Sequence, residues 1–304
     1  MDTRRALLVD AFTTDPLSGN PAGLVPEADG LADEAMAAIA RELHASETAF
    51  LLDADGSEAA RRLRYFTPTG EIDLCGHATV AAGSWLADAG DLEDGTYTFE
   101  TNAGSIEIDL EGGLVRMTPG EEVSSVSKID LGYDRVASAI GADPATLADV
   151  GADLPLATAS MGPTYLLVPV NFLEALSGLE PDSRAIAELT EELGVTGVYA
   201  FTFDALEADS TLHGRMFAPA VGVDEDPVTG TASGAVGAYL REVEAFDGEL
   251  PAEMVFEQGH FLDRPGRVRV QARTDPVSIG GRAVTAFEGT MSVPEMGEDD
   301  IIEI

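Results

Sequence analysis

The chain has 304 residues, 45% of them hydrophobic, which is enough for two domains of about 150 residues each. Acidic residues outnumber basic ones by 55 to 17, the formal net charge is −38, and Lys128 is the only lysine. Because this charge repels nucleic acid and anionic membranes, we expect neither as a partner. No apolar run in the sequence approaches the roughly 20 residues that a membrane-spanning helix needs.

The N-terminus and the sparse cysteine and histidine residues limit the protein's location and chemistry. Residues 1–10 lack the long apolar stretch of a signal peptide, so we expect a cytoplasmic protein. A single cysteine, Cys75, excludes an intramolecular disulfide and a multi-cysteine zinc site. The histidines show no HExxH or H-x-H spacing, so no metal site is expected; they are His44, His77, His213 and His260.

In chain order, the first half reads as a strand-rich α+β domain with an amphipathic helix and a second, glycine- and alanine-rich helix. The strands are expected at 6–12, 48–52, 61–66, 97–100, 105–110 and 114–117, and the helices at 32–43 and 78–88.

The second half repeats this order. Its strands are expected at 165–169, 197–203, 213–217, 254–257 and 268–272, and its helices at 183–193 and 232–243. We assign 1–120 to the first domain, together with the C-terminal segment 283–304, and 121–282 to the second. The polar stretch 120–128 is the expected linker.

An internal sequence repeat relates the two halves. Arg64-Tyr-Phe-Thr-Pro68 matches Arg215-Met-Phe-Ala-Pro219, 151 positions later. GHATVAAGSWL, residues 76–86, matches GTASGAVGAYL, residues 230–240, 154 positions later. Because small residues let a helix lie close to the surrounding backbone, each repeat should hold one central helix within its strands.

The starts of these two helices are candidate anion-binding sites. Gly76-His77 and Gly230-Thr231 lie where backbone N–H groups have no partner within a helix and the helix dipole is positive. Two such starts, facing each other across a cleft between the domains, would bind a carboxylate. The alternative is that the glycines only permit tight turns before packed helices.

Two acidic residues are candidates for proton transfer. Glu47 precedes an apolar strand, where partial desolvation would raise its pKa toward the range useful at neutral pH. Asp226, shortly before the second central helix, can orient a base. The alternatives are a solvated charge at a strand end for Glu47 and a helix cap for Asp226.

Four motifs together resemble one known family. SGNPA at 18–22, SETAF at 46–50, DLCGHAT at 73–79 and EDPVTGTA at 225–232 occur in the order found in PhzF-like phenazine-biosynthesis isomerases, which share the diaminopimelate epimerase fold. The resemblance covers nearly the whole chain. It implies two pseudo-symmetric α+β domains, each a barrel-like sheet around a central helix, in a homodimer without cofactor.

The resemblance also implies roles for individual residues. Family members that isomerise dihydro-hydroxyanthranilate use a glutamate to move a proton between ring carbons, and Glu47 matches it. His77 and Asp226 match other catalytic positions. Asn20 and Thr231 match positions near the substrate, and together with Ser46 and the helix-start glycines Gly76 and Gly230 they are the expected substrate-binding residues.

The sequence thus favours a cofactor-independent isomerase acting on a small carboxylate-containing substrate. One alternative is an epimerase or dehydratase of amino or hydroxy acids that uses Cys75. The related two-thiol epimerases place one cysteine in each half, but Thr229 aligns with Cys75 here, and threonine is not a thiolate base. Another alternative is a small-molecule binding protein without catalysis.

The net charge generates a prediction about salt. We interpret it as that of a halophilic protein, whose self-repulsion is relieved at about 1 M salt, where the screening length is about 3 Å. The melting temperature in molar KCl should exceed that in dilute buffer by many degrees in a thermal unfolding scan. An unchanged or lower melting temperature would contradict this interpretation.

Overall fold

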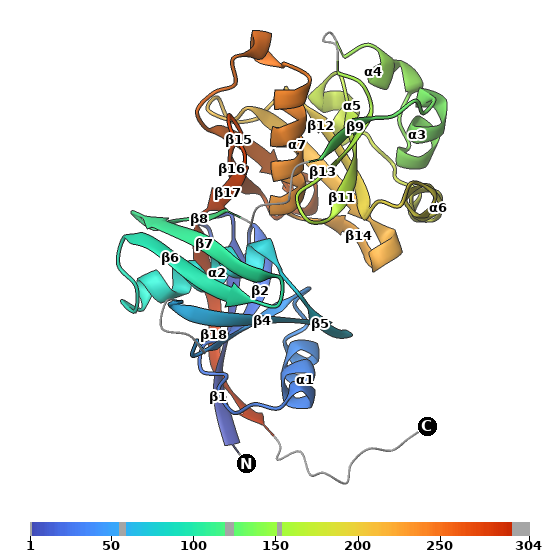
Figure 1. Ribbon diagram of the computed structural model, residues 1–304. Coiled ribbons are helices and arrows are strands. Elements are labelled where there is room, and N and C mark those ends of the chain that lie inside the picture. The colour runs from blue at the N-terminus through green and yellow to red at the C-terminus, as the bar shows by residue number, and fades with distance from the viewer. Residues whose placement is uncertain (1, 55–58, 119–124, 151–153, 294–304) are drawn as a thin grey trace. The chain divides into compact units, whose positions relative to one another are not determined.

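Two helices rich in small residues, α2 (Gly76–Asp88) and α7 (Gly230–Glu242), lie at the centres of two structural units in the computed structural model (Figure 1). The structure describes residues 2–54, 59–118, 125–150 and 154–293. The first unit comprises residues 1–117 and 282–304, and the second comprises residues 118–281. The predicted boundary between residues 120 and 121 lies outside the described residues, as do positions 294–304 of the predicted C-terminal segment.

The first unit is mostly strands, with one helix besides α2, namely α1 (Asp33–Leu43), among its described residues. Its strands are β1 (Asp2–Ala11), β2 (Asn20–Val25), β3 (Thr48–Leu52), β4 (Arg61–Thr67), β5 (Gly70–Ile72), β6 (Gly95–Thr101), β7 (Gly104–Glu111), β8 (Leu114–Thr118) and β18 (Ala283–Val293).

The second unit has the same plan with additional helices. Its strands are β9 (Val126–Lys128), β10 (Ala157–Ser160), β11 (Thr164–Pro169), β12 (Gly197–Thr202), β13 (Leu212–Ala218), β14 (Val223–Asp226), β15 (Met254–Gln258), β16 (Gly266–Gln271) and β17 (Ser278–Gly281). Its other helices are α3 (Tyr133–Ile140), α4 (Pro144–Ala148), α5 (Leu173–Ser177) and α6 (Ser183–Leu193), with short 3₁₀ turns η1 (Pro219–Val221), η2 (Phe246–Gly248) and η3 (His260–Leu262).

Strand pairing repeats in the two units. In the first, β2 and β3 are parallel, β3 and β4 antiparallel, and β4 pairs with β5 antiparallel and with β6 parallel. In the second, β11 to β15 pair in the same sequence of parallel and antiparallel contacts. The repeat is therefore present in the structure as well as in the amino-acid sequence. The prediction of an α+β fold is confirmed.

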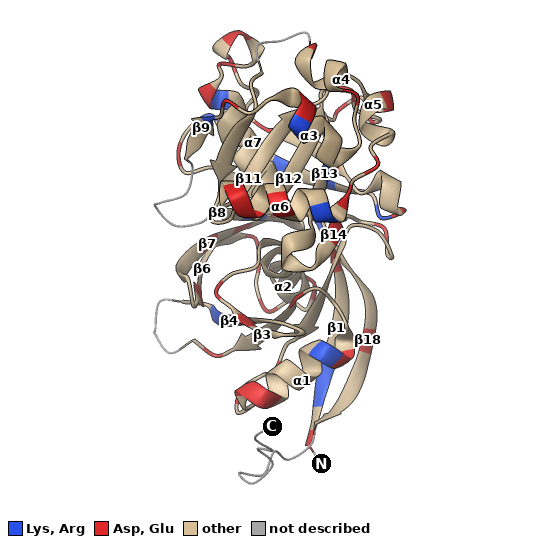
Figure 2. Ribbon diagram, turned by 90° about the vertical axis from the view of Figure 1, so that its right-hand side faces the viewer, with Lys and Arg blue, Asp and Glu red and all other residues tan. Residues whose placement is uncertain are grey.

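Each sheet curves around its central helix. Helix α2 contacts β1, β2, β3, β7 and β18, and α7 contacts β9, β10, β11, β16 and β17. Figure 2 shows α2 surrounded by strands. Since strands far apart in the pairing order contact the same helix, the sheet wraps around it, as the small residues of the two helices predict.

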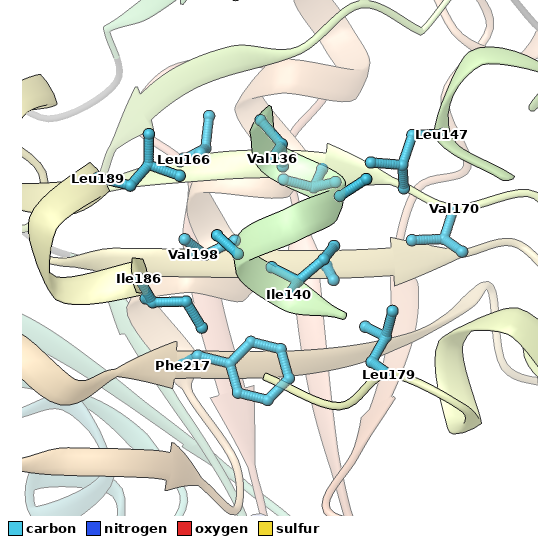
Figure 3. Close-up of a cluster of buried hydrophobic side chains, with 14 of the residues drawn as sticks. Val136, Ile140, Leu147, Leu166, Val170, Leu179, Ile186, Leu189, Val198 and Phe217 are labelled. Carbon is cyan, nitrogen blue, oxygen red and sulfur yellow. The ribbon is translucent and has the colours of Figure 1, made fainter. Parts of the chain in front are cut away.

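A second hydrophobic layer lies on the outer face of each sheet. In the second unit, α3 and α6 cover β11, β12 and β13, with Val136, Ile140, Ile186, Val198 and Phe217 among the buried side chains (Figure 3). In the first unit, α1 packs on the sheet through Met36 and Ile39 against Phe50 and Phe66. Strands covered on both faces are continuously apolar, as β12 is.

The acidic residues gather on the outer helices and loops, while most of the strands inside carry no charge (Figure 2). Helix α6 has an apolar face with Ile186 and Leu189 buried, and its opposite face is charged. This distribution keeps the net charge of −38 in contact with solvent.

The predicted linker 120–128 is wrong in part. Residues 126–128 form β9, in which Ser127 pairs with Thr158 of β10, whereas positions 120–124 lie outside the described residues. The polar composition of this segment suggested a linker. A short polar strand such as β9 is recognised only from its pairing with β10, which composition does not reveal. Strands β2, β5, β10, β14, β17 and β18 and the helices α3, α4 and α5 were not predicted either.

A repeated arginine–glutamate pair fixes the hairpin that leads into each central helix. Arg64 on β4 donates two hydrogen bonds to Glu71 on β5, both 2.7 Å, and Arg215 on β13 donates two to Glu225 on β14, at 2.9 and 2.8 Å. The Arg64 guanidinium lowers the pKa of Glu71. Such bidentate pairs fix both distance and orientation.

The two arginines differ in their third contact. Arg64 donates to the exposed carboxylate of Asp33 at 2.7 Å. Arg215 instead donates to the backbone oxygens of Leu176 and Leu179 at 3.1 and 3.2 Å, and its side chain is only 8% exposed. Removal of Arg215 would therefore leave two carbonyls and the Glu225 carboxylate without their donor.

This difference predicts unequal losses of stability. Arg215→Ala should lower the free energy of unfolding by about 3 kcal/mol, because it leaves a largely buried carboxylate unpaired. Arg64→Ala should lower it by about 1 kcal/mol, because its partners are more exposed. Urea unfolding in molar KCl measures both values. Equal losses would show that the carbonyl contacts of Arg215 contribute nothing.

Candidate active site

Three reactive side chains of the first unit lie together. The Glu47 carboxylate Oε2 is 3.4 Å from the Nε2 atom of His77, and the Cys75 Sγ atom is 3.4 Å from the Nδ1 atom of the same imidazole. The side chains of Glu47 and His77 are 23% and 11% exposed, and Cys75 is buried. The cluster thus joins an acid, an imidazole and a thiol near the surface of the unit.

The backbone around Glu47 is fixed by strand pairing. Glu47 directly precedes β3, and its carbonyl oxygen accepts a hydrogen bond from the N–H of Gly23 on β2 at 2.9 Å. Gly23 pairs with Thr48 across the parallel strands, and a Cβ atom at Gly23 would lie 2.3 Å from the Thr48 Oγ1 atom. Glycine is therefore required here for β2 to approach the strand that begins after Glu47.

A chain of buried hydroxyl groups fixes the start of α2. The Thr79 hydroxyl donates to the Cys75 carbonyl oxygen at 2.7 Å, and the Tyr65 hydroxyl on β4 lies 2.6 Å from the Thr79 hydroxyl. Burial raises the pKa of Tyr65, so its hydroxyl stays protonated. These bonds fix the N-cap residue Cys75 and, with it, His77 in the first turn.

The second unit contains a corresponding polar cluster at the start of α7. The Thr229 hydroxyl donates a short hydrogen bond to the Asp226 carboxylate. The buried Gln258 amide accepts from the Thr229 N–H at 3.0 Å and donates to the Asp226 carbonyl oxygen at 2.7 Å. Asp226 therefore has a fixed position and orientation next to the helix start.

Two further contacts repeat the arrangement of the first unit. The Ser233 hydroxyl donates to the Thr229 carbonyl oxygen at 2.9 Å, as Thr79 does to Cys75. Thr231, which aligns with His77, has its hydroxyl 2.7 Å from that of Tyr165 on β11. The position that carries an imidazole in the first unit thus carries a hydroxyl in the second.

Both central helices begin without a side-chain cap. The side chains of the N-cap residues Cys75 (α2) and Thr229 (α7) accept no hydrogen bond from the backbone N–H groups of the first turn. Neither first turn contains an acidic residue. Gly76 and Gly230 are the buried first residues of these helices. Helix starts of this kind provide N–H donors for an anion.

The structure brings together only some of the predicted site residues. It places Glu47 beside His77, and Asp226 beside the start of α7. Asn20 is the buried first residue of β2, and Ser46 is exposed next to Glu47. Their assignment to substrate binding, like that of Gly76, Gly230 and Thr231, stays a prediction.

Sequence reasoning missed two residues of the second-unit cluster, Gln258 and Tyr165. Tyr165 lies in the apolar strand β11 and Gln258 is the last residue of β15, so each is expected in the core and the pattern gives no sign of a role at the helix start. The useful signal for Gln258 is its full burial, because a buried amide needs several hydrogen-bond partners.

The first-unit cluster also has a composition that suits a metal ion. One ligand atom from each of Glu47, Cys75 and His77 lies within 4.8 Å of the others. The same three groups can equally act as acid, base and nucleophile, which needs no metal.

Comparison with known proteins decides the family. The family model described as "Phenazine biosynthesis-like protein" (PhzC-PhzF) matches residues 9–289. The chain belongs to the PhzC-PhzF family. It is 40% identical over 296 residues to an uncharacterized isomerase of Deinococcus radiodurans, with 92% of each chain covered. The predicted resemblance to PhzF-like proteins is confirmed.

Two other relatives support the fold and the class of enzyme. The crystal structure of a PhzF-family protein from Bacillus anthracis matches with a TM-score of 0.86 and 32% identity, covering 96% of this chain and 100% of that one. The trans-2,3-dihydro-3-hydroxyanthranilate isomerase of Pseudomonas aeruginosa is 29% identical over 293 residues, covering 94% of this chain and 98% of the relative. This PhzC-PhzF protein is an isomerase with the fold of its family, and a small-molecule substrate follows from that class.

Among the described residues, no helix of this PhzC-PhzF protein has the length and apolar character needed to cross a membrane.

The burial of Cys75 predicts slow chemical modification. Iodoacetamide should label the native protein at least roughly tenfold more slowly than the urea-unfolded protein, because a buried thiol is poorly reached by the reagent. Mass spectrometry over time measures the two rates. Equal rates would contradict the burial of Cys75.

Proposed function

We propose that this protein is a cofactor-independent isomerase that moves a proton between carbons of a small carboxylate-containing substrate. Glu47 is the general acid and base in this proposal. The observation that carries it is the position of the Glu47 carboxylate, partly exposed and 3.4 Å from His77, next to the uncapped start of α2. The family membership supports the reaction class.

The proposed reaction needs one group that both accepts and returns a proton. The ionised Glu47 carboxylate takes a proton from one substrate carbon, and the electron pair left behind shifts along the conjugated system. The same carboxyl group then donates the proton to another carbon on the same face, so that atoms and charge balance without an oxidant or reductant. His77 beside Glu47 orients the carboxylate and the substrate.

Binding of the substrate carboxylate is assigned to the helix starts. The backbone N–H groups at Gly76-His77 and Gly230-Thr231 are suited to an anion, because no side chain caps either helix and no acidic residue lies in either first turn. Asp226, held by Thr229 and Gln258, orients the substrate in this scheme. A homodimer in the cytoplasm is part of the proposal.

One observation favours a second candidate function, an epimerase or dehydratase that uses Cys75. The thiol lies 3.4 Å from the His77 Nδ1 atom, and an adjacent imidazole is a usual activator of a nucleophilic or basic cysteine. The aligned position in the other unit is Thr229, whose hydroxyl donates to Asp226. A second thiol base is therefore lacking at that position, which favours Glu47 as the proton carrier.

Glu47→Gln tests the assignment. The amide keeps the shape of the side chain but cannot accept a proton, so kcat should fall by at least about a hundredfold while KM changes little. The substrate to use is trans-2,3-dihydro-3-hydroxyanthranilate, the compound named for the Pseudomonas aeruginosa relative. Turnover in D2O, followed by mass spectrometry, reports whether solvent deuterium enters the product.

Two matched variants make the result specific. Glu42→Gln removes a carboxylate from an exposed position of α1 and should leave kcat unchanged. Cys75→Ala should retain most of the activity. A large loss for Cys75→Ala together with normal turnover for Glu47→Gln would overturn the proposal in favour of the thiol-based reaction.

A further inference from the structure

A second cluster of potential ligands lies in the second unit, apart from the residues at the start of α7. It consists of His213, Glu257 and His260, with one ligand atom of each within 4.8 Å of the others. The side chains of His213 and Glu257 are fully buried, and His260 is partly exposed. None of the three was predicted to act in the function of the protein.

Strand pairing places two of these residues side by side. β13 and β15 are parallel, and His213 is the register partner of Glu257. The chain then turns at Gly259, which has a φ of +87° and where a Cβ atom would lie 2.2 Å from the Arg264 carbonyl oxygen. This backbone conformation requires glycine. The turn brings His260 back to the strand pair, and the imidazole rings of His213 and His260 lie 4.8 Å apart.

Three ring nitrogens of the two histidines are buried without a hydrogen-bond partner. His213 Nδ1 is 3.2 Å from the Glu257 Oε2 atom, but the two are not aligned as a hydrogen bond. His213 Nε2 and His260 Nδ1 are also buried without a partner. A buried polar atom left in this way costs about 1–3 kcal/mol, so the arrangement calls for a ligand that interacts with the nitrogen lone pairs.

The Glu257 carboxylate is held in place by the backbone. Its Oε2 atom accepts from the Leu206 N–H and its Oε1 atom from the Glu207 N–H, both at 2.8 Å. The carboxylate also interacts with the side chains of Ser210 and His213, and its two oxygens have four lone pairs in total for these partners and a ligand. Glu257 is thus a rigid, oriented carboxylate beside the two imidazole rings.

We propose that His213, Glu257 and His260 bind a divalent transition-metal ion of the zinc type. Two imidazoles and one carboxylate are a known ligand set for such ions and leave a fourth position for water. Tetrahedral bonds of about 2 Å would draw the ligand atoms to about 3.3 Å from each other, and a rotation of the partly exposed His260 side chain supplies this movement. The net charge of −38 favours cations near the protein.

The bound ion would connect three segments of the second unit. His213 and Glu257 lie on β13 and β15, His260 lies in η3, and Glu257 also holds the backbone at Leu206 and Glu207. The ion would therefore fix η3 and the loop after β12 on the sheet. This proposal departs from the expectation that the scattered histidines form no metal site, because parallel pairing of β13 with β15 brings together residues that are far apart in the sequence.

Cobalt titration of the full chain tests the site. After removal of metals with EDTA and exchange into molar KCl, Co²⁺ should bind as one ion per chain with a visible ligand-field spectrum, and Zn²⁺ should displace it. His260→Ala should weaken Co²⁺ binding more than about tenfold. The metal-free variant should keep the wild-type melting temperature, because His260 is partly exposed on a 3₁₀ turn.

Two controls distinguish the site from other ligands. His44→Asn changes an exposed histidine with a φ of +54°, which asparagine tolerates, and should leave Co²⁺ affinity unchanged. The rival set Glu47, Cys75 and His77 would add a thiolate-to-cobalt charge-transfer band, which Cys75→Ser would abolish.

The proposal is overturned by any of three results. These are no saturable binding of Co²⁺ or Zn²⁺ to the wild type, equal affinity of the wild type and His260→Ala, or a charge-transfer band that accounts for all of the bound cobalt. Two results support the proposal. The cobalt spectrum of the wild type lacks the charge-transfer band, and the ligand-field spectrum is lost in His260→Ala but not in His44→Asn. Thermal scans with and without Zn²⁺ provide a second measurement, since the ion should raise the melting temperature of the wild type and not that of His260→Ala.

Discussion

The close approach of each central helix to its surrounding strands is the constraint on which both units depend. A Cβ atom at Gly234 of α7 would lie 1.8 Å from the Met161 Sδ atom, and one at Gly237 would lie 2.6 Å from the Val270 side chain. At Gly83 of α2 the corresponding distance to Val115 is 2.9 Å. Larger residues would push the sheet away from the helix, so the small residues decide how tightly each sheet can curve.

This packing also fixes the chemistry at the helix starts. Because each helix is held along its length, its first turn occupies one position relative to the strands that lead into it. The arginine–glutamate pairs set the preceding hairpins, and the hydroxyls of Thr79 and Ser233 bond back to the N-cap carbonyls. Polar side chains at the candidate site are thus positioned by elements whose main role is in folding.

The sequence predicts the repeat and the central helices well because both depend on local patterns of small and apolar residues. β18 and the short helix α4 escape such reasoning, since β18 pairs with a strand nearly the whole chain away and α4 is only five residues long. Glu47 and His77 could be connected only through the family resemblance. Gln258 and Tyr165 lie in buried strands, where a polar function leaves no periodic signal.

The first unit is discontinuous in sequence, which affects the order in which the protein can fold during synthesis. β1 lies between β2 and β18 and pairs with β18 from Asp2–Val293 to Ala11–Ala283. The whole second unit leaves the ribosome before β18 does. Until then one edge of β1 has unpaired backbone groups, the kind of edge that invites pairing with another chain. The N-terminal unit, although synthesised first, is therefore completed last.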